Sequence, residues 1–191
     1  MIMNNLVNAH PIFQQSVNTL KQTSKDDSNS DNIEYMTECQ NKAINFDRVK
    51  LNYAKNKFGS RNSSYKSVDA LIQTDKMVYF IEFKNGTLDG EERAKIREKL
   101  SNSILLFSDI LDLTFSNFRE ECVFILVYNK IKNSFSGVSK QKIADYVINR
   151  SENATCRFDL DKLKPFLVKE VKTYTPEEFE YFLNNNSFIS Y

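Results

Sequence analysis

The fold is decided by the stretch Ser67-Val-Asp-Ala-Leu-Ile-Gln73 and the stretch Met77-Val-Tyr-Phe-Ile-Glu-Phe83 that follows it. Both are short apolar runs rich in β-branched and aromatic residues, which is the composition of strands. The turn-like Thr74-Asp75 joins them. This pattern predicts a β-hairpin.

Three charged residues interrupt the hairpin: Asp69, Glu82 and Lys84. Charges are costly inside apolar runs, so these residues require an explanation. Side chains alternate along a strand, so Glu82 and Lys84 project from one face. A two-residue loop at Thr74-Asp75 places Asp69 opposite Phe80 and diagonal to Glu82, on that same face, with the diagonal Cα atoms about 7–8 Å apart. An odd number of loop residues would turn Asp69 to the other face.

This set of charges suits the cleavage of a phosphodiester. Asp69 and Glu82 can hold a hard divalent cation, Mg²⁺ or Mn²⁺, which keeps open positions for phosphate oxygen. Lys84 can then orient the attacking water and stabilise the negative charge that grows on the phosphate. A Glu-x-Lys tripeptide alone is a weak signal, because a solvated ion pair across strands explains it equally well. The context of the tripeptide favours the site.

A long helix and a buried strand are predicted after the hairpin. Asn85-Gly86 and Asp89-Gly90 break the chain, and an apolar stripe at helical spacing follows. The stripe consists of Ile96, Leu100, Ile104, Phe107 and Leu111. The run Glu121 to Tyr128 is almost unbroken in its apolar character, which is typical of a strand buried on both faces.

Further elements are predicted toward the C-terminus: a helix near residues 140 to 149, a strand at Phe166 to Val171, and a final helix. Thr175 as N-cap, Pro176 at the first helical position and Glu178 three residues after the cap announce the final helix. The resulting order of elements predicts an α/β or α+β fold with a mixed sheet flanked by helices, and with an extra C-terminal strand and helix.

The N-terminal residues predict an arm followed by the main domain. Apolar residues between Leu6 and Leu20 recur at helical spacing, and residues 22–32 lack any apolar side chain. We therefore expect an amphipathic arm and flexible loop over 1–31, and a single domain over 32–191. A capping box at Asp31 and Glu34 predicts a helix near 32–45. The pattern from Asp47 to Phe58 fits either a strand or a helix.

At this point the sequence resembles the PD-(D/E)XK nuclease superfamily, whose restriction-endonuclease-like core is a helix, a three-stranded antiparallel unit, a second helix and a further strand. The resemblance covers roughly residues 32 to 128 and is carried by Asp69, Glu82-Phe83-Lys84, the long helix and the buried strand. Val68 stands where the family has Pro, and the first core strand has no clear match in the sequence.

The resemblance implies a metal-dependent nuclease, from a bacterial or phage defence, toxin or mobile-element context, that acts on DNA or RNA. Asp69 and Glu82 would bind Mg²⁺ together with the backbone carbonyl of Phe83, and Lys84 would assist the water. Some members add an acid from the first helix, for which Glu34 or Glu38 is available. Others add a polar residue from the second helix, for which Lys95 or Lys99 could contact substrate.

Composition limits these expectations without deciding among them. The chain has 191 residues and a formal net charge of +1, so any basic surface for nucleic acid must be local. Its three cysteines form no disulfide or zinc pattern, and no signal or membrane span is recognised, so we expect a soluble cytoplasmic protein. His10, the sole histidine, offers no support for a catalytic triad.

Two other functions fit the sequence. The first is an inactive nuclease-like regulatory or assembly protein that binds a protein partner, or itself, through its Phe- and Tyr-rich surface or its N-terminal arm. The second is a nucleic-acid-binding module without chemistry, in which aromatic residues stack on bases. The aromatic and basic residues available for that stacking are Tyr53, Phe58, Arg61 and Tyr65.

Overall fold

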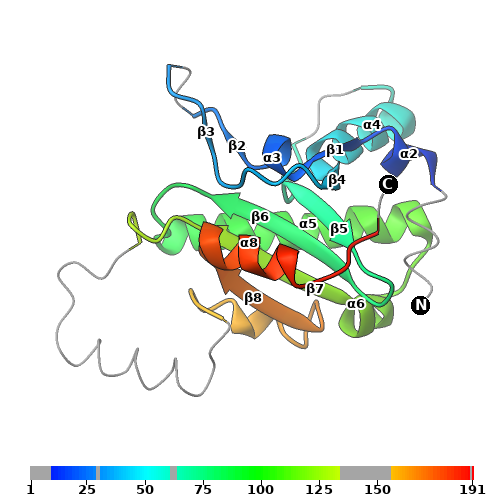
Figure 1. The fold of residues 1–191 in the computed structure, drawn as a ribbon. Coiled ribbons are helices and arrows are strands. Elements are labelled where there is room, and N and C mark those ends of the chain that lie inside the picture. Colours follow the sequence, from blue (N-terminus) through cyan, green and yellow to red (C-terminus); the bar gives the residue numbers. More distant parts are fainter. Residues whose placement is uncertain (1–9, 29–30, 61–63, 134–155, 190) are drawn as a thin grey trace.

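A six-stranded mixed sheet forms the centre of the protein in the computed structural model, which describes residues 10–28, 31–60, 64–133, 156–189 and 191 (Figure 1). The strand order is β1-β4-β5-β6-β7-β8. The sheet strands are β1 (Val17–Thr19), β4 (Lys42–Asn45), β5 (Ala70–Gln73), β6 (Val78–Lys84), β7 (Cys122–Tyr128) and β8 (Glu170–Tyr174).

The predicted hairpin is confirmed as β5 and β6, but its register differs from the expected one. The two-residue loop is Asp75-Lys76, and Thr74 N–H donates to the Met77 carbonyl at 2.9 Å. Phe80 therefore pairs with Leu71 and not with Asp69. The Thr74 hydroxyl accepts a hydrogen bond from Met77 N–H, which favours the loop one residue later than predicted. The loop length stays even, as the shared face requires.

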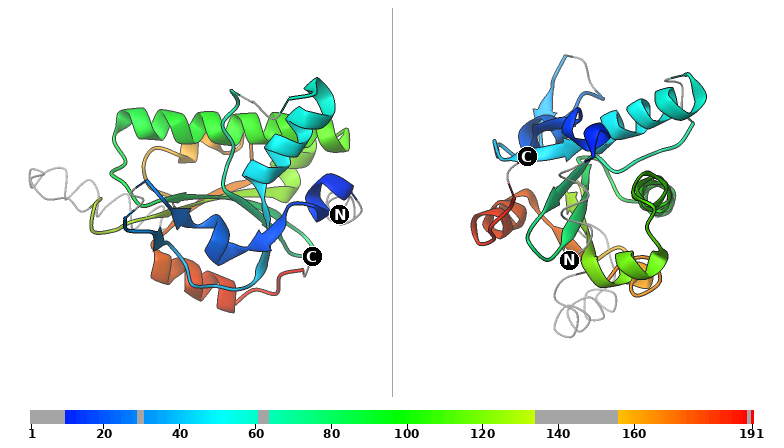
Figure 2. Two further views of the ribbon diagram at one scale, coloured as in Figure 1. Left: turned by 90° about the horizontal axis from the view of Figure 1, so that it is seen from above. Right: turned by 90° about the vertical axis from the view of Figure 1, so that its right-hand side faces the viewer.

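Helices cover both faces of the sheet (Figure 2). On one face, α4 (Phe46–Phe58), α5 (Gly90–Leu111) and α6 (Phe115–Glu121) pack on side chains such as Phe80, whose ring centroid lies 5.4 Å from that of Phe107. On the other face, α8 (Pro176–Asn184) packs on Tyr79 and Phe83. Alternate residues of β6 therefore enter two separate cores.

The long helix and the fully buried strand are confirmed. Asp89 caps α5 by accepting a hydrogen bond from Glu92 N–H at 2.9 Å. The helix carries the chain back so that β7 runs parallel to β6. All seven residues of β7 are buried, because helices cover both of its faces and a strand lies on each side.

The predicted helix at residues 32–45 is wrong. This segment forms β3 (Glu34–Tyr35) and then β4, whose Ala43 and Ile44 are fully buried on opposite faces of the sheet. The segment left open forms α4, which begins at Phe46 because Asn45 accepts a hydrogen bond from Arg48 N–H. Gly59 ends α4 with a φ of 69°, a left-handed conformation that glycine adopts without strain.

The helix predicted from the apolar spacing between Leu6 and Leu20 is also wrong over most of residues 10–20, the part that the structure describes. Residues 10–28 form α2 (Pro11–Gln14), β1, α3 (Leu20–Thr23) and β2 (Lys25–Asp26). Strand β1 pairs antiparallel with β4 and forms one edge of the sheet. Strand β2 lies within the segment predicted as a loop and pairs with β3, which lies in the segment predicted as a helix.

Toward the C-terminus, the predicted strand at 166–171 is displaced, since β8 begins at Glu170 after a 3-10 turn, η1 (Asp161–Leu163). The capping box that begins α8 is as predicted: Thr175 accepts from Glu178 N–H, and Glu178 accepts from Thr175 N–H. The helix predicted near 140–149 lies outside the described residues. Within the described ranges, no helix has the length and apolar character needed to cross a membrane.

Candidate functional site

Asp69 is the residue immediately before β5, and backbone and side-chain contacts fix its position. Its N–H donates to the Ile81 carbonyl at 3.0 Å, and its own carbonyl accepts from Phe46 N–H at 3.1 Å. The carboxylate Oδ2 accepts from the N–H of Phe83 at 2.7 Å. This hydrogen bond holds the Asp69 carboxylate against β6, next to Glu82.

Glu82 is a carboxylate without any solvent exposure of its side chain. It lies on the α5 face of β6, in the same alternating row as Phe80. Its Oε1 accepts from the Lys99 ammonium at 2.7 Å, whereas its buried Oε2 has no hydrogen-bond partner in the described part of the chain. A buried oxygen with an unused lone pair is costly, so Oε2 indicates a place where a further donor or cation can bind.

Lys99 brings the two carboxylates together. It projects from the middle of α5, and its Nζ lies 2.7 Å from Glu82 Oε1 and 3.3 Å from Asp69 Oδ1. Ser103, one turn later and fully buried, donates to the Lys99 carbonyl and accepts from the backbone N–H of Val68 at 3.0 Å. The Ser103 hydroxyl therefore fixes α5 to the residue that precedes Asp69.

The three charges strongly affect one another's protonation. Burial raises the pKa of Glu82 well above its ordinary value, the Asp69 charge raises it further, and Lys99 opposes both. Burial also raises the pKa of Asp69, against the effects of Lys99 and the Phe83 N–H. Burial alone would lower the pKa of Lys99, but Glu82 and Asp69 outweigh it and the pKa is raised. One ammonium thus faces two carboxylates, so the cluster lacks one positive charge when both carboxylates are ionised.

Lys84 shares the face of Glu82 but is paired elsewhere. Its Nζ lies 2.7 Å from Oε2 of Glu92, in the first turn of α5, while Lys95 binds the other oxygen of Glu92 at 2.8 Å. These lysines, Lys84 first, lower the pKa of Glu92 to about 2. The Lys84 charge also lowers the pKa of Glu82, so it acts on the site at longer range.

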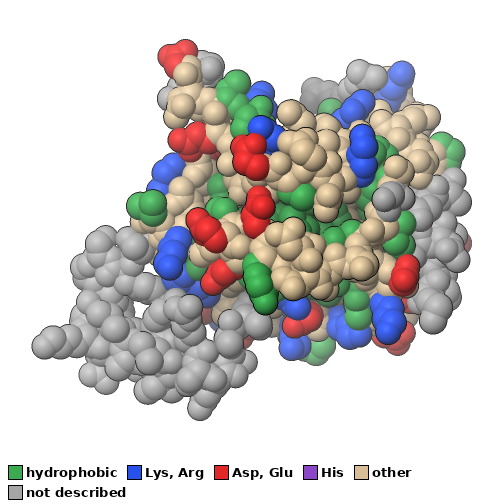
Figure 3. Space-filling view, in the orientation of Figure 1, with side chains coloured by type: hydrophobic (Ala, Val, Ile, Leu, Met, Phe, Trp, Pro, Cys, Tyr) green, Lys and Arg blue, Asp and Glu red, His purple; other side chains and the backbone are tan. Residues whose placement is uncertain are grey.

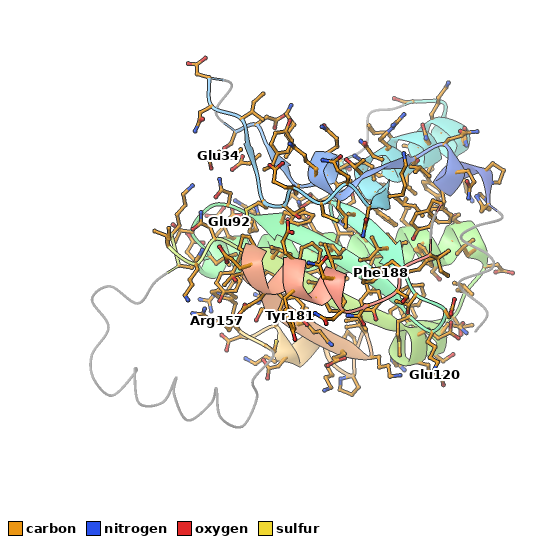
Figure 4. The ribbon with its side chains drawn as sticks, viewed as in Figure 1. Glu34, Glu92, Glu120, Arg157, Tyr181 and Phe188 are labelled. Carbon is orange, nitrogen blue, oxygen red and sulfur yellow. The ribbon has the colours of Figure 1, made fainter. Side chains whose placement is uncertain are left out.

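The remaining sequence candidates lie apart from the carboxylate pair. Lys95 binds Glu91 as well as Glu92. Glu34 lies on β3, which pairs with β2, and it accepts a hydrogen bond from the Asn85 amide. Figure 4 shows Glu34 above Glu92. Glu38 forms a surface ion pair with Lys21 at 2.7 Å.

Phe83, the expected source of a backbone carbonyl ligand, contacts Asp69 through its N–H instead. Its ring lies on the α8 face of the sheet, where its centroid is 5.7 Å from that of Phe179. The backbone of Phe83 therefore orients Asp69, while its ring packs in the core beneath α8.

Sequence reasoning identified only part of the polar row of α5 that completes the site. It offers Lys99 as a possible substrate contact and assigns no site role to Glu92 or Ser103. Glu92, Lys99 and Ser103 follow one another at intervals of seven and four residues, which places them on one side of a helix. That side borders the apolar stripe, so polar residues beside a buried stripe were the signal that could have identified them.

The described residues contain no preformed group of three or more His, Cys, Asp or Glu side chains arranged to hold a metal ion. The donor types that are present do fit Mg²⁺, which prefers carboxylate oxygens and retains several waters. Among the described residues, Glu82 Oε2 has no hydrogen-bond partner, and Asp69 Oδ1 lies 3.3 Å from the Lys99 ammonium. Asp69 and Glu82 are thus the residues that would hold a divalent cation.

A second surface feature lies on the opposite face, between β8 and α8. A shallow hollow of about 520 Å³ is lined by Tyr174, Tyr181, Phe182 and the carboxylate-bearing Glu177 and Glu178, among others. Tyr181 is 73% exposed. Acidic side chains gather on this face of the molecule in Figure 3.

The fold and the site define the chain as a mixed α/β protein with a six-stranded mixed sheet and a buried carboxylate pair on one face. A scan against protein-family models finds no match, and comparisons with curated proteins and with solved structures find none either.

Proposed function

We propose that the protein is a metal-dependent nuclease that hydrolyses phosphodiester bonds of DNA or RNA at the site formed by Asp69, Glu82 and Lys99. The observation that carries the proposal is the convergence of two carboxylates, one of them fully buried with an unpartnered oxygen, beside a lysine. Keeping such a costly arrangement in a core requires a compensating role, and cation binding supplies one.

The arrangement of strands around the site also supports the proposal. Strands β4, β5 and β6 form an antiparallel unit, α5 follows, and β7 returns parallel to β6. This is the order that the resemblance to PD-(D/E)XK nucleases implies. One departure is that α4 lies between β4 and β5, where the family core has no helix, and only the short α3 stands near the place of the family's first helix.

Each residue has a role that follows from its contacts. Glu82 and Asp69 would hold the divalent cation, and the hydrogen bond from Phe83 N–H keeps the Asp69 carboxylate oriented. When bound, the cation supplies a Lewis acid for a phosphate oxygen and a water of lowered pKa. Lys84 and Lys99 provide the positive charge nearest to the carboxylates, where negative charge on a phosphate would develop.

Basic residues of α5 are available to contact a nucleic acid. Positions 93, 95, 97 and 99 are all Lys or Arg, although the chain is almost neutral overall. Lys95 is held by Glu91 and Glu92, and Arg93 by Asp159 at 3.2 Å, so part of this charge is compensated within the protein. We propose that backbone phosphates compete for these side chains, which makes binding weaken as salt rises.

The test is cleavage of labelled single- and double-stranded DNA and RNA with Mg²⁺ or Mn²⁺. Wild-type protein should cleave at least one substrate, and Asp69→Asn and Glu82→Gln should each lower the rate at least about 100-fold, as expected for loss of electrostatic stabilisation. Glu120→Gln is the matched control, since Glu120 is an exposed carboxylate on α6 and lies at the other end of the molecule from Glu92 in Figure 4. Equal cleavage by Glu82→Gln and wild type would refute the proposal.

A second candidate function is a nuclease-like binding protein without activity, and the pairing of Lys84 favours it. In this structure Glu92, and not Asp69 or Glu82, binds the Lys84 ammonium. The exposed Tyr181 beside the α8 hollow offers a surface for a protein partner. If purified protein cleaves no substrate with either metal, and Tyr181→Ala abolishes capture of a defined partner, this function replaces the first.

The third possibility, base stacking without chemistry, has partial geometric support. Tyr53 and Phe58 are in edge-to-face contact with centroids 6.2 Å apart, and Phe58 and Tyr65 are exposed. However, the Tyr53 hydroxyl already donates to Asp109 at 2.6 Å, which ties this ring to α5. Arg61 lies outside the described residues.

A further inference from the structure

The candidate site already contains a cation of its own. The Lys99 ammonium lies 2.7 Å from Glu82 and 3.3 Å from Asp69, between the two carboxylates. A divalent cation held by Glu82 Oε2 and Asp69 Oδ1 would compete with Lys99 for Asp69 Oδ1 and for the charge of Glu82. Two cations so close together in a water-poor site would repel each other strongly.

We infer that Lys99 is a resident counter-ion that a divalent cation must displace from Glu82 and Asp69 before the site becomes competent. This inference rests on the proposed function, since it assumes that the carboxylates bind a metal ion. It adds a regulatory step to that function: the resting site is closed by the protein's own ammonium group, and metal concentration opens it.

The contacts identify Lys99 as the part that moves. Glu82 has no solvent exposure, and Asp69 is held by the Phe83 N–H, so neither carboxylate can turn away without breaking the packing around β6. The Lys99 side chain is 22% exposed. Its ammonium can reach water by rotation about its four methylene groups while the backbone of α5 stays fixed by Ser103.

Lys99 also interacts with a third carboxylate, since the charge of Asp47 acts on it electrostatically. Asp47 lies at the start of α4 and accepts hydrogen bonds from Lys50 and Ser67. Asp47 thus favours the charged form of Lys99 at its observed position.

Displacement has a measurable effect on affinity. If only a fraction of molecules has Lys99 away from the carboxylates, the apparent metal affinity is reduced by that fraction. Replacing Lys99 by an uncharged side chain removes the competitor. We expect Lys99→Met to bind Mn²⁺ about 10- to 100-fold more tightly than wild type.

The decisive experiment uses the wild-type chain and therefore does not depend on the folding of a variant. Lysine acetylation by acetic anhydride is quantified by mass spectrometry with and without saturating Mn²⁺, and metal binding is measured in parallel by calorimetry. We expect the labelling rate of Lys99 to rise several-fold with metal, because its amine leaves a half-buried ion pair. The rate at Lys57, which binds Asp109 away from the carboxylate pair, should stay constant.

Three outcomes are distinguishable. A selective rise at Lys99, together with tighter Mn²⁺ binding by Lys99→Met than by Lys57→Met, supports the exchange. Calorimetric binding with unchanged labelling of Lys99 overturns the exchange but leaves the metal site and the proposed nuclease standing. If neither wild type nor Lys99→Met binds Mn²⁺, the proposed function fails, and the inference that rests on it fails too.

Discussion

The Lys99 ammonium lies 2.7 Å from Oε1 of Glu82, a carboxylate with no solvent exposure, and it is also within ion-pair distance of Asp69. Helix α5 and strand β6 are thus joined by a charge contact inside an apolar layer. Because the cluster has two negative groups and one positive group, the consequences of removing each member differ in size and in pH dependence.

Lys99→Met should destabilise the fold strongly at neutral pH. It leaves two buried carboxylates without a counter-charge, and breaking a buried pair costs roughly 3–5 kcal/mol. The pKa values of Glu82 and Asp69 are already raised by burial, so their ionised forms destabilise the folded state at pH above their ordinary values. The cost of the substitution should therefore shrink as the pH falls and both groups take up protons.

Urea denaturation of Lys99→Met and wild type over a series of pH values measures this effect. Lys57→Met is the control, because Lys57 forms an exposed ion pair with Asp109 and its loss should cost well under about 1 kcal/mol. A constant difference between Lys99→Met and wild type at all pH values would show that packing, and not charge, is what Lys99 contributes.

Glu82→Gln should cost less than Lys99→Met, since it leaves Asp69 and Lys99 as one charge of each sign. In the double variant the unpaired charges partly disappear, so the two effects should not add. Residues in direct contact typically couple by about 0.5–3 kcal/mol, and a value in that range is expected from the double-mutant cycle. Strict additivity would contradict the direct charge contact between the two residues.

Glu92→Gln tests the pairing of Lys84. Hydrogen bonds from Lys84 and then Lys95 lower the pKa of Glu92 to about 2. A depressed carboxyl pKa stabilises the fold above the ordinary value of 4.5, and this stabilisation is lost as the pH falls toward 2. The stability difference from wild type should be about 1 kcal/mol at neutral pH and should disappear on acidification.

Stability measured by denaturation along a falling pH series checks this prediction, with Glu120→Gln as the exposed control. If Glu92→Gln and wild type have the same pH profile of stability, the ion pair between Lys84 and Glu92 is not populated.

Glu92→Gln also frees Lys84 from its partner. If Glu92 holds Lys84 away from the carboxylates, the acetylation rate of Lys84 should respond more strongly to Mn²⁺ in this variant than in wild type.

The sequence predicted those elements whose signal is local. The hairpin, α5, β7 and the cap of α8 each carry their own periodicity or capping residues, and all are found. Strand β4 was missed because its four residues form a strand only through β1 and β5, which lie far away in the chain. The capping box read at Asp31 and Glu34 was a local pattern that these long-range pairings override.

The residues of the candidate site were also recognisable only where their signal is local. Charges inside apolar runs identified Asp69 and Glu82 directly. The partner of Glu82 depends on how α5 lies over the sheet, so the sequence alone selected Lys84 on the same strand as the nearest lysine. The structure gives that position to Lys99, which lies 17 residues after Glu82 in the sequence.

Ser103→Ala should weaken both the fold and the site, because the Ser103 hydroxyl connects Val68 and Lys99. The backbone N–H of Val68 is buried and would lose its partner, at a cost of about 1–3 kcal/mol. Asp69 follows Val68 directly, so the geometry of the carboxylate pair should loosen as well, and Mn²⁺ affinity should fall. Ser103→Thr keeps the hydroxyl and is the matched variant. If calorimetry gives equal Mn²⁺ affinities for Ser103→Ala and Ser103→Thr in folded protein, α5 does not position the site through this hydroxyl.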